Sequence, residues 1–430
     1  MESLRIILVS DWYLPRKGGV ETAMYNLARI LLARGHDPVV LTHQTKSNPN
    51  PPPLDSGDGF PVVRLKVPLK GDDYTTSYKA ALQLFDFIKH NAPDVIHGHS
   101  LVSPFAVTAI HGAKGILGVP TVLTHHSLIY EELNPWRKIL ARYALRRVDI
   151  PTAVSTVVKN DLEKIYGRNR PPILLTPNCI DLDNWRKTSP TYEGDPVVSF
   201  IARLTKRKNP ILAIKAFKAI LEEKRKAHLY IAGEGPLERE VREYINASGV
   251  KENATLLGPL DREGVRKLLS SSHLFLMPGR KEAFSIASLE ALSLGVPVIG
   301  FHGTGLEDMV VDGLNGFLAV DEGDFIYKTR LLATNERMRV AMSANAFNSA
   351  RTFDCKAIVY RYLDAYRKAV SMCTSEKRVL LYSIYRILRG DPVKPGEWCV
   401  DRKCRYHRRR PRKNSIPYIR RGTGCTTLPG

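Results

Sequence analysis

Two glutamates lie eight positions apart in the stretch RKEAFSIASLEALSLGVPVIG, residues 280 to 300. The residues before them read as a strand and those after about Ser285 as a helix, so Glu282 lies on a loop and Glu290 about two turns into the helix. Between them, the backbone amides of Phe284, Ser285 and Ile286 are free donors at a helix start and suit a phosphate. The alternative is ordinary: one solvated loop charge and one surface helix charge.

Other positions offer anion-binding chemistry of the same kind. Gly18 and Gly19 follow the first strand and precede a helix, where backbone amides can approach an anion closely. In IARLTKRKNP, Arg203 ends a strand and Lys208 precedes the next helix, so both can neutralise a diphosphate. The alternative for the glycine pair is an ordinary turn. The alternative for Arg203 and Lys208 is a solvated basic loop.

A glycine-rich turn and a group of histidines complete the candidates. Gly233, Glu234 and Gly235 end a strand in AGEGP, which can accommodate a nucleotide or serve only as a turn. Three histidines and a serine are expected to face a cleft from the ends of two strands, where an imidazole can contact a sugar or phosphate. They are His97, His99, His126 and Ser127. A single histidine in such a place is more often structural.

The elements that position these residues alternate along the chain. Short, nearly continuous apolar strands are separated by helical patterns, which predicts βαβ units and buried parallel sheets. The alternation restarts after a turn-rich connector near 181–195, so we expect two α/β domains at 1–180 and 196–352. A helix at 353–371 is expected to return to the first domain, and ligands should bind in a cleft between the two sheets. The Pro-rich stretch TKSNPNPPPLDSGDGF is expected to be a loop.

Length, hydropathy and cysteine spacing limit the class of protein. A chain of 430 residues exceeds the size of one core. It contains no apolar run long enough to span a bilayer and no signal-like start, so we expect a cytoplasmic protein that meets membranes only from the surface. Six cysteines at unpatterned spacings indicate a reduced compartment instead of a disulfide framework.

The net charge of +21 is unevenly distributed. Residues 372–430 carry 15 Lys and Arg against 4 Asp and Glu. This basic tail, expected to be poorly ordered alone, is suited to anionic lipid head groups or nucleic acid. Nucleic-acid binding is the less favoured partner because no recognition motif accompanies RYHRRRPRK. Deleting the tail is expected to weaken liposome binding and to leave donor binding intact.

These motifs in this order resemble the retaining glycosyltransferases of family 4, which have the GT-B fold of two Rossmann-like domains. The resemblance covers about residues 4–371 and rests on GGVE, TPN, ARLTKRKNP, GEGP and the glutamate pair in EAFSIASLE. The stretches VSDWYLPRKGGVET, LLARGH, HGHS and THHSLI look most like the catalytic subunits of phosphatidylinositol N-acetylglucosaminyltransferases. The resemblance therefore implies UDP-N-acetylglucosamine as donor and an inositol phospholipid or related lipid as acceptor.

The family's site roles fall on matching residues. Gly19, Arg203 and Lys208 would bind phosphate, Glu282 the sugar hydroxyls and Glu290 the ribose. Phe284, Ser285 and Ile286 would offer amides to the sugar and diphosphate, and His126 would lie beside the transferred sugar. The usual mechanism is front-face attack by the acceptor, with positioning and charge stabilisation as the main contributions.

No metal or other cofactor is expected. Asp181 and Asp183 imitate the metal-binding motif of the other glycosyltransferase fold, but they lie in the interdomain connector. Cys399, Cys404, His407 and Cys425 fit no standard zinc spacing.

The acceptor side is expected to include the basic helix NPWRKILARYALRR at 134–147. Its apolar residues form one stripe among five cations, as in a helix that rests on an anionic membrane, although a docked helix with a solvated basic face gives the same pattern. Transfer to another lipid, mannosyl or glucosyl transfer, a sugar-nucleotide epimerase and a polyanion-binding protein are the alternative functions. The sequence carries no signal for an oligomeric state.

Overall fold

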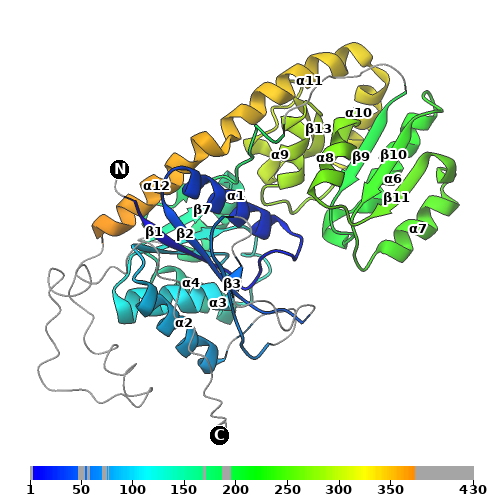
Figure 1. The fold of residues 1–430 in the computed structure, drawn as a ribbon. Coiled ribbons are helices and arrows are strands. Elements are labelled where there is room, and N and C mark those ends of the chain that lie inside the picture. The colour runs from blue at the N-terminus through cyan, green and yellow to red at the C-terminus, as the bar shows by residue number, and fades with distance from the viewer. Residues whose placement is uncertain are drawn as a thin grey trace, which may run out of the picture.

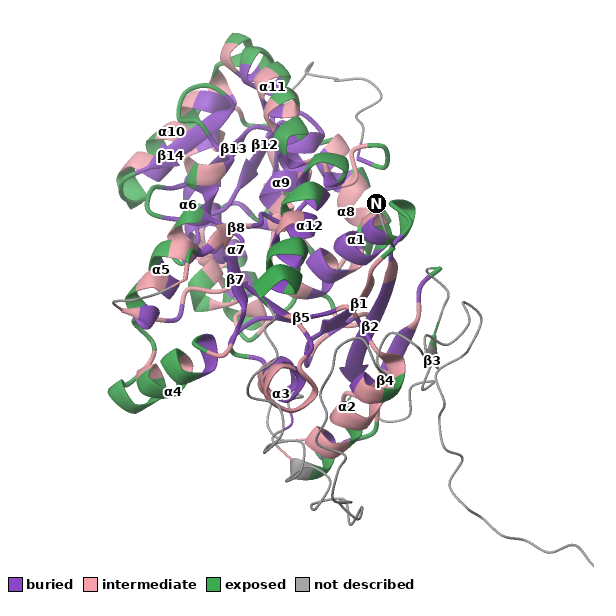
Figure 2. Ribbon diagram, turned by 90° about the vertical axis from the view of Figure 1, so that its left-hand side faces the viewer, coloured by how far each residue is buried: buried purple, intermediate pink, exposed green. Residues whose placement is uncertain are grey.

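The computed structural model describes residues 3–46, 54–55, 59–69, 75, 77–167, 171–185 and 195–372. These residues form two α/β lobes, each built on its own sheet (Figure 1). We call them the N-terminal and C-terminal domains. The sheets are buried and helices cover them, which agrees with the continuous apolar strands of the sequence (Figure 2).

The N-terminal sheet has eight strands in the order β3-β4-β2-β1-β5-β6-β7-β8. They are β1 (Arg5–Val9), β2 (Asp37–His43), β3 (Leu54–Asp55), β4 (Val62–Leu65), β5 (Val95–His99), β6 (Thr121–His125), β7 (Ile150–Ala153) and β8 (Leu174–Leu175). All neighbours pair in parallel except β3, which pairs antiparallel with β4. The expectation that the Pro-rich stretch is only a loop is therefore wrong at Leu54–Asp55, because two of its residues pair with the sheet edge.

Helices of the N-terminal domain begin where the sequence supplies capping side chains. The helices are α1 (Gly19–Ala33), α2 (Tyr78–Asn91), α3 (Pro104–Gly112), α4 (Pro135–Leu145) and α5 (Thr156–Tyr166). Ser103, Asn134 and Ser155 each accept a hydrogen bond from an amide of the first turn. Such caps satisfy donors that a helix start leaves open. By contrast, α1 begins after Gly18 with no side-chain cap.

The C-terminal sheet has six parallel strands in the order β11-β10-β9-β12-β13-β14. They are β9 (Val197–Ile201), β10 (His228–Ala232), β11 (Ala254–Gly258), β12 (Leu274–Leu276), β13 (Val298–Phe301) and β14 (Gly316–Ala319). The helices that follow them are α6 (Pro210–Leu221), α7 (Glu238–Ala247), α8 (Arg262–Ser270), α9 (Ile286–Ser293), α10 (Glu322–Thr334), α11 (Glu336–Ala350) and α12 (Cys355–Met372).

Both sheets have a point at which the strand order reverses. In the first sheet β1 lies between β2 and β5, and in the second β9 lies between β10 and β12. Crevices that bind ligands form beyond the carboxyl ends of strands at such points. Among the residues that the sequence selects, the loops after β1, β9 and β12 carry Gly18, Arg203, Lys208, Glu282, Phe284 and Ser285.

The chain crosses between the domains twice, and the two crossings lie side by side. Ile180 and Asp354 form a parallel bridge, with hydrogen bonds from Ile180 to Phe353 and from Cys355 to Ile180. After the second crossing, α12 runs along the N-terminal domain (Figure 1), in contact with α1, β5, β6 and β7. The C-terminal domain is thus inserted between two adjacent segments that are both anchored to the N-terminal domain.

A disulfide bond joins Cys179 to Cys355 at this double crossing. The two cysteines are 176 residues apart in the sequence, so no local spacing announces the pair. The expectation of reduced cysteines is wrong for these two. Cys373, Cys399, Cys404 and Cys425 lie outside the described residues.

Among the described residues, no helix combines the length and apolarity that crossing a bilayer requires. This holds for α12, the longest of the helices, which alternates buried apolar and exposed charged positions along its length.

Replacing Cys179 or Cys355 with serine should lower the free energy of unfolding by about 2–4 kcal/mol, because the open chain regains conformational freedom when unfolded. The double replacement should cost no more than either single one, since each breaks the same bond. Denaturant melts of the oxidised variants measure the effect. Peptide mapping without reductant provides the control, and recovery of the two cysteines only on separate peptides would contradict the bond.

Candidate functional site

The loop between β12 and α9 holds Glu282 against Lys208, which lies in the loop after β9. Both side chains are largely buried, and the Lys208 ammonium donates to the Glu282 carboxylate in an ion pair. The backbone of Glu282 is also fixed, because its carbonyl accepts from Gly305 N at 2.7 Å. The two residues that the sequence assigns to sugar and phosphate binding therefore lie in direct contact.

Ser285 starts α9 in an unusual conformation. Its φ is +70°, in the left-handed region that non-glycine residues seldom adopt. The Ser285 hydroxyl contacts the Ser288 hydroxyl at 2.7 Å and accepts from Ser288 N at 3.2 Å, which compensates the conformation locally. Ile286 is the first helical residue. The first amides of a helix have no partner within the helix, so an anion can approach them at such a start.

The same loop is held from the N-terminal domain. The Ser155 hydroxyl donates to Ala283 O at 2.6 Å, and Thr156 N donates to Asp308 Oδ2 at 2.7 Å. Lys281 Nζ lies 3.5 Å from Glu132 Oε1, on the loop between β6 and α4. These contacts join the two domains around the Glu282 loop. Ser155 and Asp308 are positions that motif spacing does not reveal.

Glu290 lies on α9 with little exposure, and its pKa is raised. Burial raises the pKa of Glu290 to about 8, and the nearby positive charge of Arg262 only partly opposes this. Arg262 begins α8 and lies over the rings of Tyr25, at 5.6 Å, and Trp185, at 5.8 Å. A carboxyl group that is largely neutral near pH 7 is characteristic of functional sites.

The glycine pair after β1 meets the basic loop after β9 across the domain boundary. Burial raises the pKa of Glu21, while Arg16 and Arg203 lower it through their charges. Because the charge of Arg203 acts on the pKa of Glu21, Arg203 lies near the start of α1. In the same region, Lys17 Nζ donates to Leu260 O at 3.1 Å. Gly18 and Gly19 therefore lie on one side of the boundary and Arg203, which is exposed, on the other.

Gly233 and Gly235 support the loop that carries Arg203. Their φ values are +137° and +156°, and a Cβ atom at either position would collide with backbone atoms of Ala202 or Leu204. Leu204 N donates to Glu234 O at 2.9 Å, so the two turns are paired. The packing requirement accounts for these glycines, and Glu234 is exposed beside them.

His126 and His99 form a stacked pair at the ends of β6 and β5. Their rings are 5.3 Å apart at 25°, and His99 Nδ1 lies 3.1 Å from His126 Nε2. Burial, with the neighbouring histidines, holds the pKa of both rings well below the usual range. Both are therefore neutral near pH 7, and they share one hydrogen between the facing nitrogens. Ser127 follows, half-buried, in the loop after β6.

His97 lies behind this pair, with its ring centre 4.2 Å from that of His99, and not at a cleft, which corrects the expectation that it faces one. It is fully buried, with Nδ1 2.8 Å from the Tyr366 hydroxyl on α12 and Nε2 2.7 Å from the Thr124 hydroxyl. Burial lowers the pKa of His97 to about 3. Both ring nitrogens are engaged within the protein, so His97 joins the sheet to α12 and is not available to a ligand.

Sequence patterns did not identify Asp11, which organises the loops of the N-terminal domain. Its fully buried carboxylate accepts from the Ser103 hydroxyl at 2.5 Å, from Phe105 N at 3.0 Å and from Thr75 N at 3.3 Å. His43 Nε2 lies 3.0 Å away on its other side. One carboxylate thus joins the loop after β1 to the end of β2, to the segment between β4 and α2, and to the loop after β5 with the start of α3. An Asp directly after the first strand was the only available signal.

Asp181 and Asp183 have partners in the connector. Asp183 forms an ion pair with Lys356 at 2.6 Å, and Asp181 accepts from Asn184 at 2.5 Å. Within the described ranges, no cluster of three or more His, Cys, Asp or Glu side chains is arranged to hold a metal ion. The tail residues Cys399, Cys404, His407 and Cys425 lie outside the described residues.

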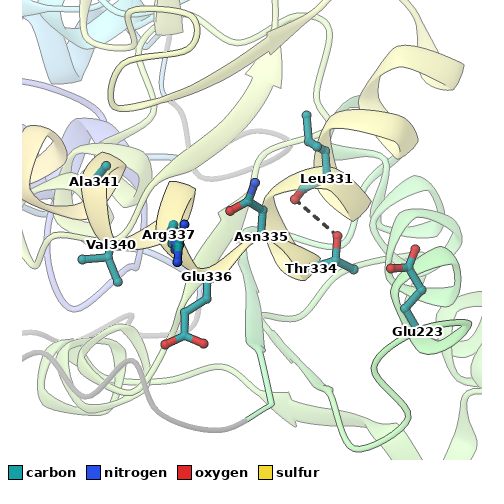
Figure 3. A pocket seen from close by; sticks show the side chains of 8 residues that line it. All are labelled: Glu223, Leu331, Thr334, Asn335, Glu336, Arg337, Val340 and Ala341. Carbon is teal, nitrogen blue, oxygen red and sulfur yellow. Dashed lines mark hydrogen bonds between the residues drawn. The ribbon is translucent and has the colours of Figure 1, made fainter.

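A hollow of about 890 Å³ lies outside this site, where α10 meets α11 (Figure 3). Its walls consist of Glu223, Leu331, Thr334, Asn335, Glu336, Arg337, Val340 and Ala341. In Figure 3 the labelled side chains point in different directions and do not converge on a common point. The hollow includes none of the residues that the sequence selects for chemistry.

Two family models together match most of the chain. The model described as Glycosyltransferase Family 4 matches residues 17–184, and the model described as Glycosyl transferases group 1 matches residues 181–349. The two ranges meet at the first interdomain crossing. Each model therefore covers one of the two domains.

Relatives and solved structures agree with these matches. A phosphatidylinositol N-acetylglucosaminyltransferase subunit of Arabidopsis thaliana is 25% identical over 75% of this chain and 73% of its own. The protein of the same name from Homo sapiens is 27% identical over 72% of this chain, which spans 64% of that protein. Anabaena HepE in complex with UDP and glucose superimposes with a TM-score of 0.69 at 17% identity, over 84% of this chain and 98% of that one.

These matches set aside the epimerase and the purely polyanion-binding alternatives, because the family models and the relatives describe sugar transfer. Two α/β domains, each built on a sheet with a switch point in its strand order, are the architecture of the GT-B fold. The chain is a glycosyltransferase with the GT-B fold and belongs to family 4, the group 1 glycosyl transferases.

Proposed function

We propose that this glycosyltransferase moves N-acetylglucosamine from UDP-N-acetylglucosamine to an inositol phospholipid, with retention of configuration at the sugar carbon. The observation that carries the proposal is the similarity, over about three quarters of the chain, to proteins whose names state that transfer. The reaction takes place at the cytoplasmic face of a membrane, where both a soluble donor and a lipid acceptor are accessible. A metal or other cofactor forms no part of the proposal.

Arg203 and Lys208 neutralise the donor diphosphate. Arg203 is exposed at the domain boundary beside the amides that follow Gly18 and Gly19. Lys208 is paired with Glu282 in the ligand-free protein, so donor binding exchanges this contact for one with phosphate. The exchange gives Lys208 an anionic partner in the phosphate and leaves Glu282 to hydrogen bonds from the donor, so neither buried group loses all its partners.

The two glutamates recognise hydroxyl groups on either side of the diphosphate. Glu282, once released by Lys208, accepts from hydroxyls of the sugar, and Glu290 accepts from hydroxyls of the ribose. The amides of Phe284, Ser285 and Ile286 face the phosphates between them. This assignment is supported by the contact of Glu282 with Lys208 and by the position of Glu290 on α9, the helix that follows the Glu282 loop.

His126 acts as a neutral hydrogen-bonding group beside the transferred sugar. The low pKa of its ring means that it carries no positive charge near pH 7. It therefore orients a sugar hydroxyl and does not stabilise the leaving group electrostatically. His99 fixes the ring through the shared hydrogen, and Ser127 lies on the acceptor side of the same loop.

The transfer exchanges one bond for another on the same face of the sugar. The bond from the anomeric carbon to the β-phosphate oxygen breaks, and a bond to the acceptor oxygen forms. The acceptor hydroxyl gives its proton to the departing diphosphate. The enzyme contributes alignment of the two substrates and stabilisation of the negative charge on the diphosphate.

UDP-N-acetylglucosamine should raise the melting temperature of the protein by several degrees at saturating concentration. A ligand present at about 100 times its Kd stabilises the folded state by about 2.7 kcal/mol. A thermal-shift panel that also includes UDP-glucose, GDP-mannose and ADP-glucose measures the preference. Transfer of radiolabelled N-acetylglucosamine to phosphatidylinositol in mixed micelles then tests the acceptor.

Glu290→Ala should lose most of that shift, whereas Glu240→Ala, on the exposed face of α7, should keep it. A shift with none of the nucleotide sugars would contradict the donor site. A clear shift without transfer to phosphatidylinositol would retain the donor and reject the acceptor.

Affinity for the nucleotide sugar should increase with pH until about pH 8 and then remain constant. The ligand-free Glu290 is protonated below its raised pKa of about 8, whereas accepting ribose hydroxyls favours the ionised form. Binding therefore releases a proton, and affinity should change by up to about tenfold per pH unit well below the pKa. Calorimetric titrations in buffers of different ionisation enthalpy measure this release.

Glu290→Gln is the matched variant, because it keeps the shape of the side chain and cannot titrate. It should bind more weakly at pH 8 and show no proton release attributable to this position. The same proton release in wild type and variant would show that another group titrates.

A further inference from the structure

Helix α4 exposes a continuous apolar stripe. The side chains concerned are Trp136, 66% exposed, Ile139, 56%, Leu140, 51%, and Tyr143, 53%. Their spacing of three and four residues places them on one face of the helix. Near its C-terminal end, the buried Ala144 and Leu145 attach α4 to the domain. In Figure 2, α4 is a mostly exposed helix at the margin of the N-terminal domain.

Positive charges surround this stripe, and no acidic residue lies between Asn134 and Val148. The cations are Arg137, Lys138, Arg142, Arg146 and Arg147. None of the ion pairs formed among the described residues involves them. Two of them lie over aromatic rings: Lys138 is 3.9 Å from the ring centre of Tyr130, and Arg147 is 4.6 Å from that of Tyr143. Their charges therefore remain available beside the apolar stripe.

This combination fits an anionic lipid surface better than a protein partner. The centre of a protein interface is depleted of charge, especially lysine, whereas α4 has five cations within one turn of its apolar residues. A bilayer offers hydrocarbon to the stripe and phosphates to the cations at the same time. Trp136 and Tyr143 carry amphipathic rings of the kind that prefers the level of the head groups.

The position of α4 connects the stripe with the candidate site. The loop that leads into α4 begins at His126, and its Glu132 pairs with Lys281 beside the Glu282 loop. A surface that covers α4 therefore adjoins the loop after β6, which begins at His126.

We propose that α4 is the membrane-docking surface of this enzyme and that it seats the protein on anionic lipid beside the acceptor entrance. The proposal rests on the proposed function for its lipid acceptor. The binding itself depends only on the chemistry of α4 and is measured separately.

The test is flotation of the full chain with vesicles of phosphatidylcholine alone and of phosphatidylcholine mixed with phosphatidylglycerol. Phosphatidylglycerol supplies charge without being the proposed acceptor. Wild type should bind the mixed vesicles. The double variant Trp136→Ser with Leu140→Ser should bind them at least roughly tenfold more weakly, because these two side chains can no longer bury apolar surface in the bilayer. Arg137→Gln with Arg146→Gln should weaken binding in low salt and have less effect in high salt.

Tyr327→Ser with Val340→Ser is the matched control, because both side chains are exposed apolar residues of the C-terminal domain. It should bind as wild type does. The basic segment 372–430 is present in every protein compared, so its contribution is constant. The melting temperature and the UDP-N-acetylglucosamine shift should be unchanged in the α4 variants, which separates loss of docking from misfolding and from failure of the donor site.

Equal vesicle binding by wild type and the Trp136 and Leu140 variant would overturn the proposal. So would a concentration-dependent dimer in light scattering that the same variant abolishes without changing vesicle binding, because α4 would then cover a second copy of the chain. Normal docking without any nucleotide-sugar shift would retain this surface and reject the proposed function.

Discussion

The double crossing between the domains is the constraint that determines how the two domains meet. Ile180 and Asp354 form a bridge, Cys179 and Cys355 form a covalent bond beside it, and α12 fixes the second crossing to the first sheet. Two independent linkers would let the C-terminal domain rotate freely about each one. Two adjacent, bonded strands instead restrict its motion to bending about a single hinge.

This hinge lies next to the loop that carries Glu282. Phe353, at the second crossing, packs against Phe284 with ring centres 5.8 Å apart. The same loop is bound by Ser155 from the N-terminal domain and by Gly305 from its own. Any movement of the hinge would therefore act on the residues between Glu282 and Ser285 through these contacts.

The electrostatic character of the site follows from which charges are compensated. Glu282 is neutralised by Lys208, Glu290 is largely protonated near pH 7, and the imidazoles of His99 and His126 are neutral. Arg203 is left exposed at the domain boundary. A cleft with neutral or paired groups and an exposed guanidinium attracts an anion, and the diphosphate of a nucleotide sugar is such an anion.

Local sequence patterns predicted the two sheets and placed Lys208 and Glu282 at the same cleft, because these features follow from strand hydrophobicity and from residues that follow adjacent strands. They failed where the decisive partner is distant in sequence. His97 was expected in a cleft because β5 ends near it, yet Tyr366 of α12 occupies the space in front of its ring. The disulfide and the Asp11 network likewise join residues 31 to 176 positions apart.

Backbone strain marks the cleft independently of any motif. Among the described residues, the non-glycine positions with positive φ are Ala92, Ser100, Asn209 and Ser285. The last three follow β5, β9 and β12, which are strands at the two switch points. Each such conformation costs on the order of 1–3 kcal/mol and persists only when its surroundings enforce it. The buried sheets on either side provide that enforcement, so the most regular part of the fold maintains the irregular loops that would hold the donor.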